Sequence, residues 1–219
     1  MIFTSIAMIE PVETSPATCR RCGQCCLKGG PTLHREDLPL LGPDGIRRAQ
    51  LVTLRRGETV RENVAGGLVR LESEVVKIAG LGQTPVCLFH DHAARACLIH
   101  ARRPAECRAL FCEDTSALES LYRRNRLTRG DILDQGGGLW ELVTFHDRTF
   151  PADMASELSR KAAVGRREAF ESLVELSRAE ESFRRAFMEK TGIEALELDF
   201  YFGRSLARVC APFGMRFPD

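Results

Sequence analysis

The sequence has no long hydrophobic run and no excess of charge of either sign. No segment approaches the roughly 18 uninterrupted apolar residues that a membrane helix needs, so we expect no membrane partner. Lys and Arg total 31 against 30 Asp and Glu, and this balance predicts no binding to nucleic acid. The first residues lack the basic segment and the cleavage site of a signal peptide, which predicts a cytoplasmic protein.

Familiar catalytic motifs are also missing. There is no HExxH sequence, no Ser-His-Asp order and no paired-carboxylate signature, so the sequence predicts no particular reaction. The three glycines at 136–138 lack the Lys-Ser/Thr pair of a P-loop and the spacing of a dinucleotide site. We interpret them as a turn that leads into a strand over residues 139–145. Whether the protein is an enzyme stays open.

What the sequence does contain is nine cysteines. Eight of them fall into two groups, and Cys210 stands alone on the apolar face of a predicted helix, where we expect a small buried side chain. Disulfides do not persist in a reducing cytoplasm, so such dense spacing favours a metal site, with a disulfide framework as the alternative. The eight predicted metal ligands are Cys19, Cys22, Cys25, Cys26, Cys87, Cys97, Cys107 and Cys112.

The first group has the spacing Cys-x2-Cys-x2-Cys-Cys. Thiolates two residues apart can both face one ion from a tight turn, and Gly23 suits such a turn because glycine readily adopts positive φ. The first three cysteines match the opening of a bacterial ferredoxin motif, but Cys26 follows at once in place of the usual x3-Cys-Pro. Adjacent cysteines do not easily serve the same tetrahedral ion, so Cys25 or Cys26 bridges or serves a second site.

The second group places Cys87, Cys97 and Cys107 ten residues apart and adds Cys112 five residues later. This spacing suits the two arms of a hairpin followed by a turn, which would bring these cysteines to the first group. Eight thiolates allow two four-cysteine sites, one four-cysteine site with spare thiols, or a multinuclear centre. We expect an iron–sulfur cluster in preference to zinc.

Several polar residues flank the cysteines. His90, His92 and His100 are candidates to complete a coordination shell or to carry protons, although ordinary surface histidines are the alternative. Arg103 and Arg108 are candidates to donate hydrogen bonds to cluster sulfides or to hold the carboxylates of Glu106 or Asp91; ordinary surface pairing is the alternative.

The fold class predicted is α+β. Apolar and β-branched segments at 51–54, 67–71 and 75–78 predict a small antiparallel sheet. Thr32 is expected to cap a short helical turn, and Ser116 with Glu119 to form a capping box for a helix.

Three regions are expected along the chain. Residues 1–18 are predicted to form a flexible leader, 19–130 a small metal-stabilised, cysteine-rich domain with short strands, and 131–219 a mainly helical region packed on it. Within the last region, helical periodicity begins at residue 152, is interrupted at Thr191 and Gly192, and resumes in one helix over 196–210.

The cysteine pattern from Cys19 to Cys112, with Arg103-Pro104 and Phe111-Cys112 in the second group, resembles the YkgJ-type cysteine-cluster family. The resemblance covers roughly residues 18 to 114 and implies a zinc- or iron-chelating domain with these eight cysteines as ligands. Flagellin lysine methylases carry a similar cluster, so a metal-dependent modifying enzyme is one alternative. A zinc-stabilised module that binds a protein partner through its C-terminal helices is another.

Overall fold

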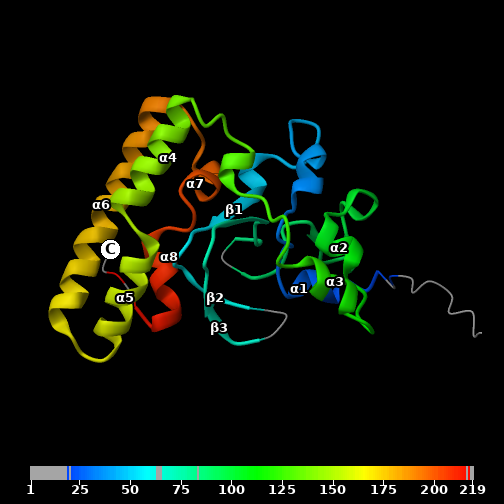
Figure 1. Ribbon diagram of the computed structural model, residues 1–219, viewed down its shortest axis with the longest axis horizontal. Helices are drawn as coiled ribbons and strands as arrows, with labels where there is room; N and C mark the ends of the chain where they lie inside the picture. Colours follow the sequence, from blue (N-terminus) through cyan, green and yellow to red (C-terminus); the bar gives the residue numbers. More distant parts are fainter. Residues whose placement is uncertain (1–18, 20, 63–65, 83, 216, 218–219) are drawn as a thin grey trace, which may run out of the picture.

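A computed structural model describes residues 19, 21–62, 66–82, 84–215 and 217, and the predicted leader 1–18 lies outside this part of the chain. The fold is α+β, as predicted. Three long helices, α4, α5 and α6, lie at one end of the molecule, while the short helices α1, α2 and α3 lie at the other (Figure 1). Strand β1 lies between the two ends.

The described strands form three two-stranded antiparallel sheets, β1 with β4, β2 with β3 and β5 with β6. In the first sheet Leu51 pairs with Ile78 and Leu54 with Val75. Branched side chains favour this pleated, half-buried arrangement, which confirms the strands predicted at 51–54 and 75–78. The strands are β1 (Leu51–Leu54), β2 (Thr59–Arg61), β3 (Leu68–Arg70), β4 (Val75–Ile78), β5 (His90–Asp91) and β6 (Ala96–Cys97).

The helices increase in length towards the C-terminal half and then shorten again. Helix α5 packs against both α6 and α8, and α6 ends where Gly192 takes a φ of 69°, which confirms the predicted interruption there. The helices are α1 (Gln24–Leu27), α2 (Ala105–Ala109), α3 (Ser116–Leu121), α4 (Gly138–Thr149), α5 (Ala152–Ala163), α6 (Arg167–Thr191), α7 (Leu198–Tyr201) and α8 (Leu206–Cys210).

The largest buried cluster joins the two ends of the molecule. It combines Cys26 and Cys87 with strand residues such as Val76 and with the aromatic residues Phe200 and Phe202. A smaller cluster among α5, α6 and α8 includes Cys210, which is fully buried, as the sequence predicted. The cysteine-rich part and the helical part therefore share one core.

The strand predicted over 139–145 is wrong, because this segment belongs to helix α4. Its β-branched and aromatic residues favour a strand locally, but Val143 and His146 are buried three residues apart, which is the spacing of a helix face. Thr144 donates its hydroxyl hydrogen bond to the carbonyl of Trp140, four residues earlier, at 2.9 Å. Packing of one face against the core has overridden the local preference.

The single C-terminal helix predicted over 196–210 is also wrong. The chain forms α7 and α8 instead, separated by Gly203 at a φ of 72°. A Cβ at this glycine would meet Arg55 Cγ at 2.9 Å and Thr53 O at 3.0 Å, so the backbone there lies directly on the end of β1. The contact that breaks the helix comes from about 150 residues earlier in the chain, and the local sequence did not reveal it.

Two predicted helix caps are replaced by other contacts. Thr32 forms a β-bridge with Lys77, and the 3₁₀ helix Arg35–Leu40 begins after His34, whose amide donates to Asp37 Oδ2 at 2.9 Å. At α3 the residue before the helix is Thr115, which donates its hydroxyl hydrogen bond to Glu119 at 2.6 Å. Both segments are helical, but the capping residue differs from the prediction.

Candidate functional site: two cysteine groups beside a buried ion network

The first cysteine group occupies a tight turn and the short helix α1. Arg21 and Gly23 both have positive φ, 54° and 73°, and the Arg21 amide donates to Cys19 Sγ at 3.4 Å. A Cβ at Gly23 would lie 2.8 Å from both Arg95 O and His90 Nε2. Glycine is therefore required at position 23 for its conformation and for the close approach of the second cysteine group.

The second group reaches the first through backbone contacts. The amide of Cys87 donates to the carbonyl of Cys26 at 2.7 Å, although 61 residues separate them in sequence. The amide of His90 donates to Cys87 O at 2.9 Å, and His90 then pairs with Cys97 in the β5–β6 hairpin. The predicted hairpin is therefore present, and it carries Cys97 back beside Cys87.

The thiols are close enough to affect one another's ionisation. Burial, together with the thiols of Cys25, Cys87 and Cys97, raises the pKa of Cys26 to about 12. Burial likewise raises the pKa of Cys107 far above its ordinary value, and four neighbouring thiols raise it further. A buried thiol without a nearby cation stays protonated, and a bound metal ion supplies that positive charge.

The eight thiols do not form a finished coordination shell. Cys26 and Cys87 are buried, Cys22 and Cys112 are exposed, and the other four are partly buried. Among the described residues, no three Cys, His, Asp or Glu side chains come together closely enough to hold a metal ion. The structure thus brings the predicted ligands into one neighbourhood, and their role as ligands stays a prediction.

A set of polar contacts fixes helix α2, which carries Cys107. Glu106 accepts a hydrogen bond from the Thr32 amide at 2.7 Å, and its other oxygen lies 3.4 Å from His34 Nε2. Asp37, which is fully buried, accepts a hydrogen bond from the Ala105 amide at 2.8 Å, at the start of α2. These contacts span 68 to 74 residues, so no local pattern revealed that Asp37 and Glu106 position Cys107.

Lys77 is a further residue near the cysteines that the sequence did not single out. It lies on β4 opposite Val52, between the buried residues Val76 and Ile78, so its side chain points to the other face of the sheet. Burial lowers the pKa of Lys77, whereas Glu106, Cys107 and Cys87 act in the opposite direction. A cation therefore lies beside two candidate ligands, where it offsets thiolate charge.

The flanking histidines and arginines divide into two kinds. Arg108 makes an exposed ion pair with Glu36 at 2.6 Å, which is the ordinary surface pairing considered as its alternative, and His92 is exposed. By contrast, three of the flanking residues each have a buried nitrogen with no hydrogen-bond partner among the described residues: His90 Nδ1, His100 Nε2 and Arg103 Nε. Buried polar atoms are normally paired, so these three remain available to a group at the cysteine site.

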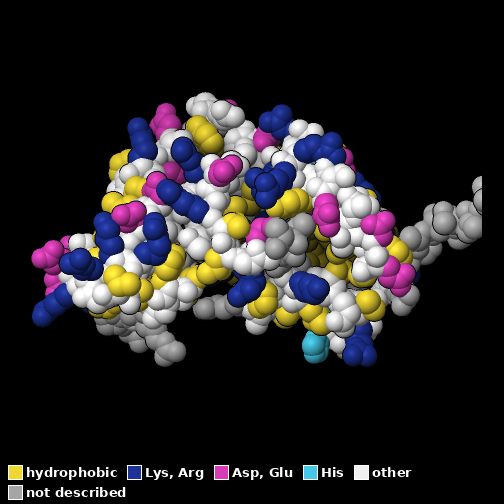
Figure 2. Space-filling view, turned by 60° about the horizontal axis from the view of Figure 1, so that its bottom comes forward, with side chains coloured by type: hydrophobic (Ala, Val, Ile, Leu, Met, Phe, Trp, Pro, Cys, Tyr) yellow, Lys and Arg dark blue, Asp and Glu magenta, His cyan; other side chains and the backbone are white. Residues whose placement is uncertain are grey.

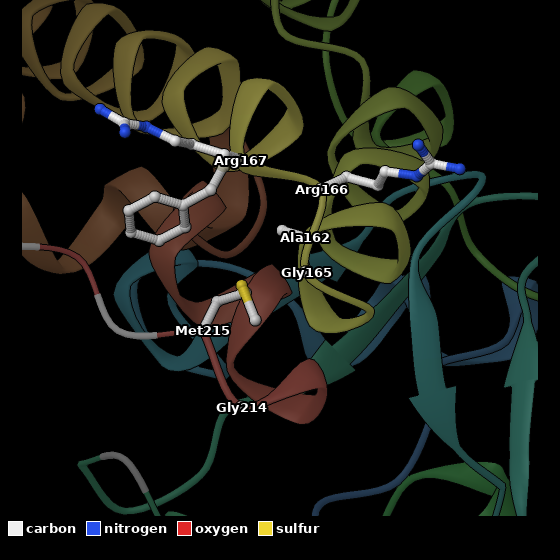
Figure 3. A pocket seen from close by; sticks show the side chains of 7 residues that line it. Ala162, Gly165, Arg166, Arg167, Gly214 and Met215 are labelled. Carbon is white, nitrogen blue, oxygen red and sulfur yellow. The ribbon is translucent and has the colours of Figure 1, made fainter.

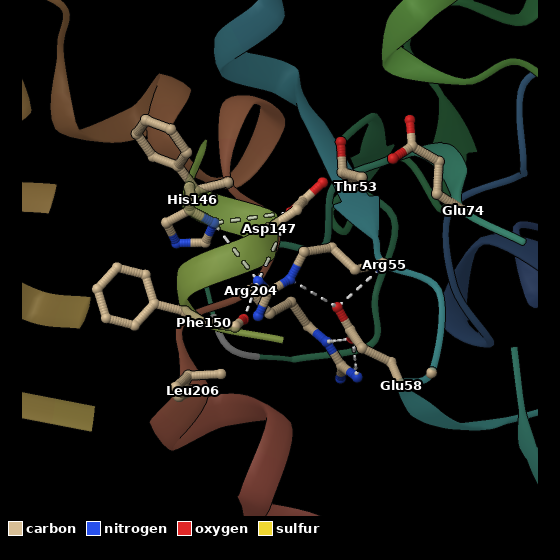
Figure 4. Close-up of polar contacts among 12 residues, drawn as sticks. Thr53, Arg55, Glu58, Glu74, His146, Asp147, Phe150, Arg204 and Leu206 are labelled. Carbon is tan, nitrogen blue, oxygen red and sulfur yellow. Dashed lines mark hydrogen bonds and ion pairs between the residues drawn. The ribbon is translucent and has the colours of Figure 1, made fainter. Parts of the chain in front are cut away.

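A network of buried ions joins the residues that follow β1 to helix α4 and to the segment before α8 (Figure 4). At its centre Arg129, only 1% exposed, donates to Glu74 and Asp147 and, at 2.6 Å, to the carbonyl of Tyr201. Burial alone would lower the pKa of Arg129, but the two carboxylates outweigh it and raise that pKa. Arg129 thereby joins the start of β4 to α4 and α7.

The network continues into the helical part through His146 and Glu180. His146 Nε2 lies 3.1 Å from Glu180 Oε1, and Glu180 also accepts hydrogen bonds from Arg184 and, at 3.1 Å, from the Leu206 amide. Burial would raise the pKa of Glu180, yet these partners lower it to about 2. His146 Nδ1 lies 3.4 Å from an Arg55 nitrogen, which can only donate, so the proton of a neutral His146 sits on Nε2.

A surface pocket of about 460 Å³ lies at the turn between α5 and α6 (Figure 3), at the opposite end of the molecule from α1 and α2 (Figure 1). Phe170 and Met215 line it, while the side chains of Arg166 and Arg167 point in opposite directions rather than into it. On the face drawn in Figure 2, basic and acidic side chains are interspersed and form no patch of one sign. Neither feature suggests a site that competes with the cysteine groups.

Comparison with known families agrees with this site. Residues 18–123, just under half of the chain, match the family described as "CxxCxxCC: Putative zinc- or iron-chelating domain". Comparison with curated proteins and with solved structures gave no match. Within the described residues, no helix is both long enough and apolar enough to cross a membrane.

Proposed function

We propose that this protein, which carries a zinc- or iron-chelating domain at residues 18–123, binds metal through its eight grouped cysteines and that the metal is iron, held with inorganic sulfide. The observation that carries the proposal is the convergence of thiols from two distant segments, anchored by the hydrogen bond from Cys87 to Cys26. Thiolates are soft ligands that suit both zinc and iron–sulfur clusters.

The sequence spacing of the first cysteine group favours a cluster over a single zinc ion. Cys19, Cys22 and Cys25 match the opening of a bacterial ferredoxin motif, in which cysteine thiolates hold iron and sulfide. Cys26 follows at once, so the remaining ligands of a cluster would come from the second cysteine group.

The residues around the cysteines suit a group that carries thiolate charge. Lys77 lies beside Cys87 and Cys107, and it lowers the pKa of Cys87 against the effect of burial. Arg103 Nε, buried and unpaired among the described residues, is a donor available to a sulfur. Binding requires each thiol to lose its proton, so metal uptake should release protons. All nine cysteines are free thiols, which suits a reducing compartment such as the cytoplasm.

The test is elemental analysis of protein purified without oxygen. We expect a brown protein that contains iron and acid-labile sulfide in similar amounts. A colourless protein with stoichiometric zinc would overturn the iron assignment and leave metal binding intact. A folded protein that retains neither metal and takes up neither on reconstitution would overturn the whole proposal.

A further inference from the structure

We propose that a surface recess in the cysteine-rich part binds a small aliphatic acid in its ionised, carboxylate form. The recess, which we call the 39–46 groove, has a volume of about 330 Å³. Its walls are the chain from Pro39 to Ile46, together with Ile99 and Arg102. The described residues that line it include no cysteine, so the inference does not depend on the proposed metal binding.

The loop that forms most of the wall is fixed by its own backbone. The amide of Ile46 donates to Leu40 O at 2.8 Å, and the amide of Gly42 donates to Ile46 O at 3.1 Å. A Cβ at Gly45 would lie 2.2 Å from Leu40 O, so the close approach there requires glycine. Sites for small molecules are usually formed before the ligand arrives, because ordering a loop on binding costs free energy. The 39–46 groove meets this condition.

Aliphatic side chains from two distant segments line the groove. Ile46 is 5% exposed, and Leu40, Leu41 and Ile99 are partly buried and pack against the main core. A ligand group that fills this space must therefore be apolar, because apolar surface gains most from leaving water. The volume lies at the small end of the roughly 300–1,000 Å³ that is usual for ligand sites. This size favours a small molecule over a segment of a protein partner.

Arg102 supplies the positive charge of the groove. Its side chain is exposed, and Nη1 donates to the carbonyl of Asp44 at 3.2 Å, which holds the guanidinium against the loop. Among the described residues no carboxylate pairs with Arg102. A guanidinium has five N–H donors in a planar fork that matches a carboxylate, so most of its donors remain for a ligand.

Asp44 limits the charge that the ligand can carry. It lines the groove together with Arg102, and these two residues give the lining a formal charge of zero. A ligand with one negative charge can pair with Arg102. A doubly charged phosphate would be repelled by the Asp44 carboxylate in the same small space. The lining therefore favours a single carboxylate on an aliphatic body.

The test compares two probes with the same aliphatic body, N-acetyl-leucine and its neutral amide, on the full chain. Binding is followed by NMR through the methyl signals of Ile46 and Ile99. We expect saturable shifts with the acid and about fivefold weaker binding of the amide, which is the most that an exposed ion pair usually contributes. Equal binding of both probes would overturn the carboxylate assignment. No saturable shift with either would overturn the site.

Two variants locate the charge. Arg102→Met keeps a long apolar side chain, so it should bind the acid as weakly as the wild type binds the amide, while its affinity for the amide stays unchanged. The matched control, Arg95→Met, changes an exposed arginine outside the groove and should bind the acid like the wild type. An equal loss in both variants would show a general effect of charge and overturn the role of Arg102.

A third probe separates a small molecule from the end of a protein chain. The tripeptide Ala-Ala-Leu carries the same side chain and carboxylate, and we expect it to bind no more tightly than N-acetyl-leucine. Tighter binding of the tripeptide would overturn the assignment of a small molecule and favour a protein C-terminus. The metal content of the same samples is measured separately, so failure of the proposed metal binding cannot be mistaken for failure of the groove.

Discussion

Burial acts on ionisable groups at both ends of this molecule, but the groups that surround Glu180 and Cys26 differ. In the helical part, the buried carboxylate of Glu180 is held by His146 and Arg184, and its pKa falls to about 2. In the cysteine-rich part, the buried thiol of Cys26 has other thiols as neighbours, and its pKa rises to about 12. The carboxylate of Glu180 therefore has basic partners, whereas the groups that shift the pKa of Cys26 are other thiols, and a bound metal ion would supply the positive charge.

Metal removal should affect the two parts very differently. Structural metal sites built from thiolates contribute on the order of 10 kcal/mol to folding, so chelation should greatly raise hydrogen exchange at α1, β5, β6 and α2. The amides in the middle of α6 should keep most of their protection, because their packing and ion pairs need no metal. If hydrogen exchange rose equally in α6, the two parts would not differ in their dependence on metal.

Arg129→Met tests how much the ion network contributes. The change leaves Glu74 and Asp147 without their shared cation, and breaking such a buried pair costs about 3–5 kcal/mol. The free energy of unfolding, measured with urea, should fall by that amount. Arg124→Met is the matched control at an exposed position nearby, and its effect should stay within about 0.5 kcal/mol. Equal effects would mean that the network holds nothing together.

The pH dependence of the free energy of unfolding should reveal the contribution of the ionised Glu180 carboxylate. Its pKa is lower in the folded protein than the ordinary value of 4.5, so its contribution is complete above about pH 4.5 and is lost as the pH falls towards 2. A lowering of this size corresponds to roughly 3 kcal/mol. Urea unfolding of wild type and Glu180→Gln, in the same metal state, should diverge above pH 4.5 and converge towards pH 2. A constant difference would argue against the lowered pKa.

Two glycines offer the smallest and most local comparison. Gly23 in the cysteine turn and Gly165 before α6 both have positive φ, 73° and 85°, so alanine costs each about 1–2 kcal/mol in backbone strain. Only at Gly23 would the new Cβ also meet the backbone of Arg95, at 2.8 Å. Chelator competition should show about tenfold weaker metal binding for Gly23→Ala, because 1.4 kcal/mol corresponds to about tenfold in affinity. Gly165→Ala should bind metal as tightly as the wild type. Equal metal affinity in both variants would mean that the turn at Gly23 does not contribute to metal binding.

Much of the fold could be predicted from local patterns. The branched residues of β1 and β4, and the amphipathic repeats of α5 and α6, carry their own signals over a few turns or one strand. The segment 139–145 carried no local signal for its helix, because its residues favour a strand. It becomes helical because Val143 and His146 are buried on one face. The break at Gly203 needs a contact with Arg55, which no local pattern contains.

The candidate site shows the same division. Cysteine spacing singles out the eight thiols and the role of Gly23, because closely spaced residues of one type can be recognised from the sequence alone. Asp37, Glu106 and Lys77, which position or neutralise those cysteines, are common residue types that contact the site only after folding. Metal choice and binding of a partner by the C-terminal helices stay predictions.

The hydrogen bond between Cys26 and Cys87 also sets an order of events during synthesis. The first four cysteines leave the ribosome before the hairpin and α2 exist, and 86 residues separate Cys26 from Cys112. At about 5–20 residues per second, the ribosome needs roughly 4–17 s for that stretch. During this interval the early thiols are exposed to oxidants and to stray metal ions, with no partner strand to shield them. A site that draws on both cysteine groups can form only after translation has passed α2.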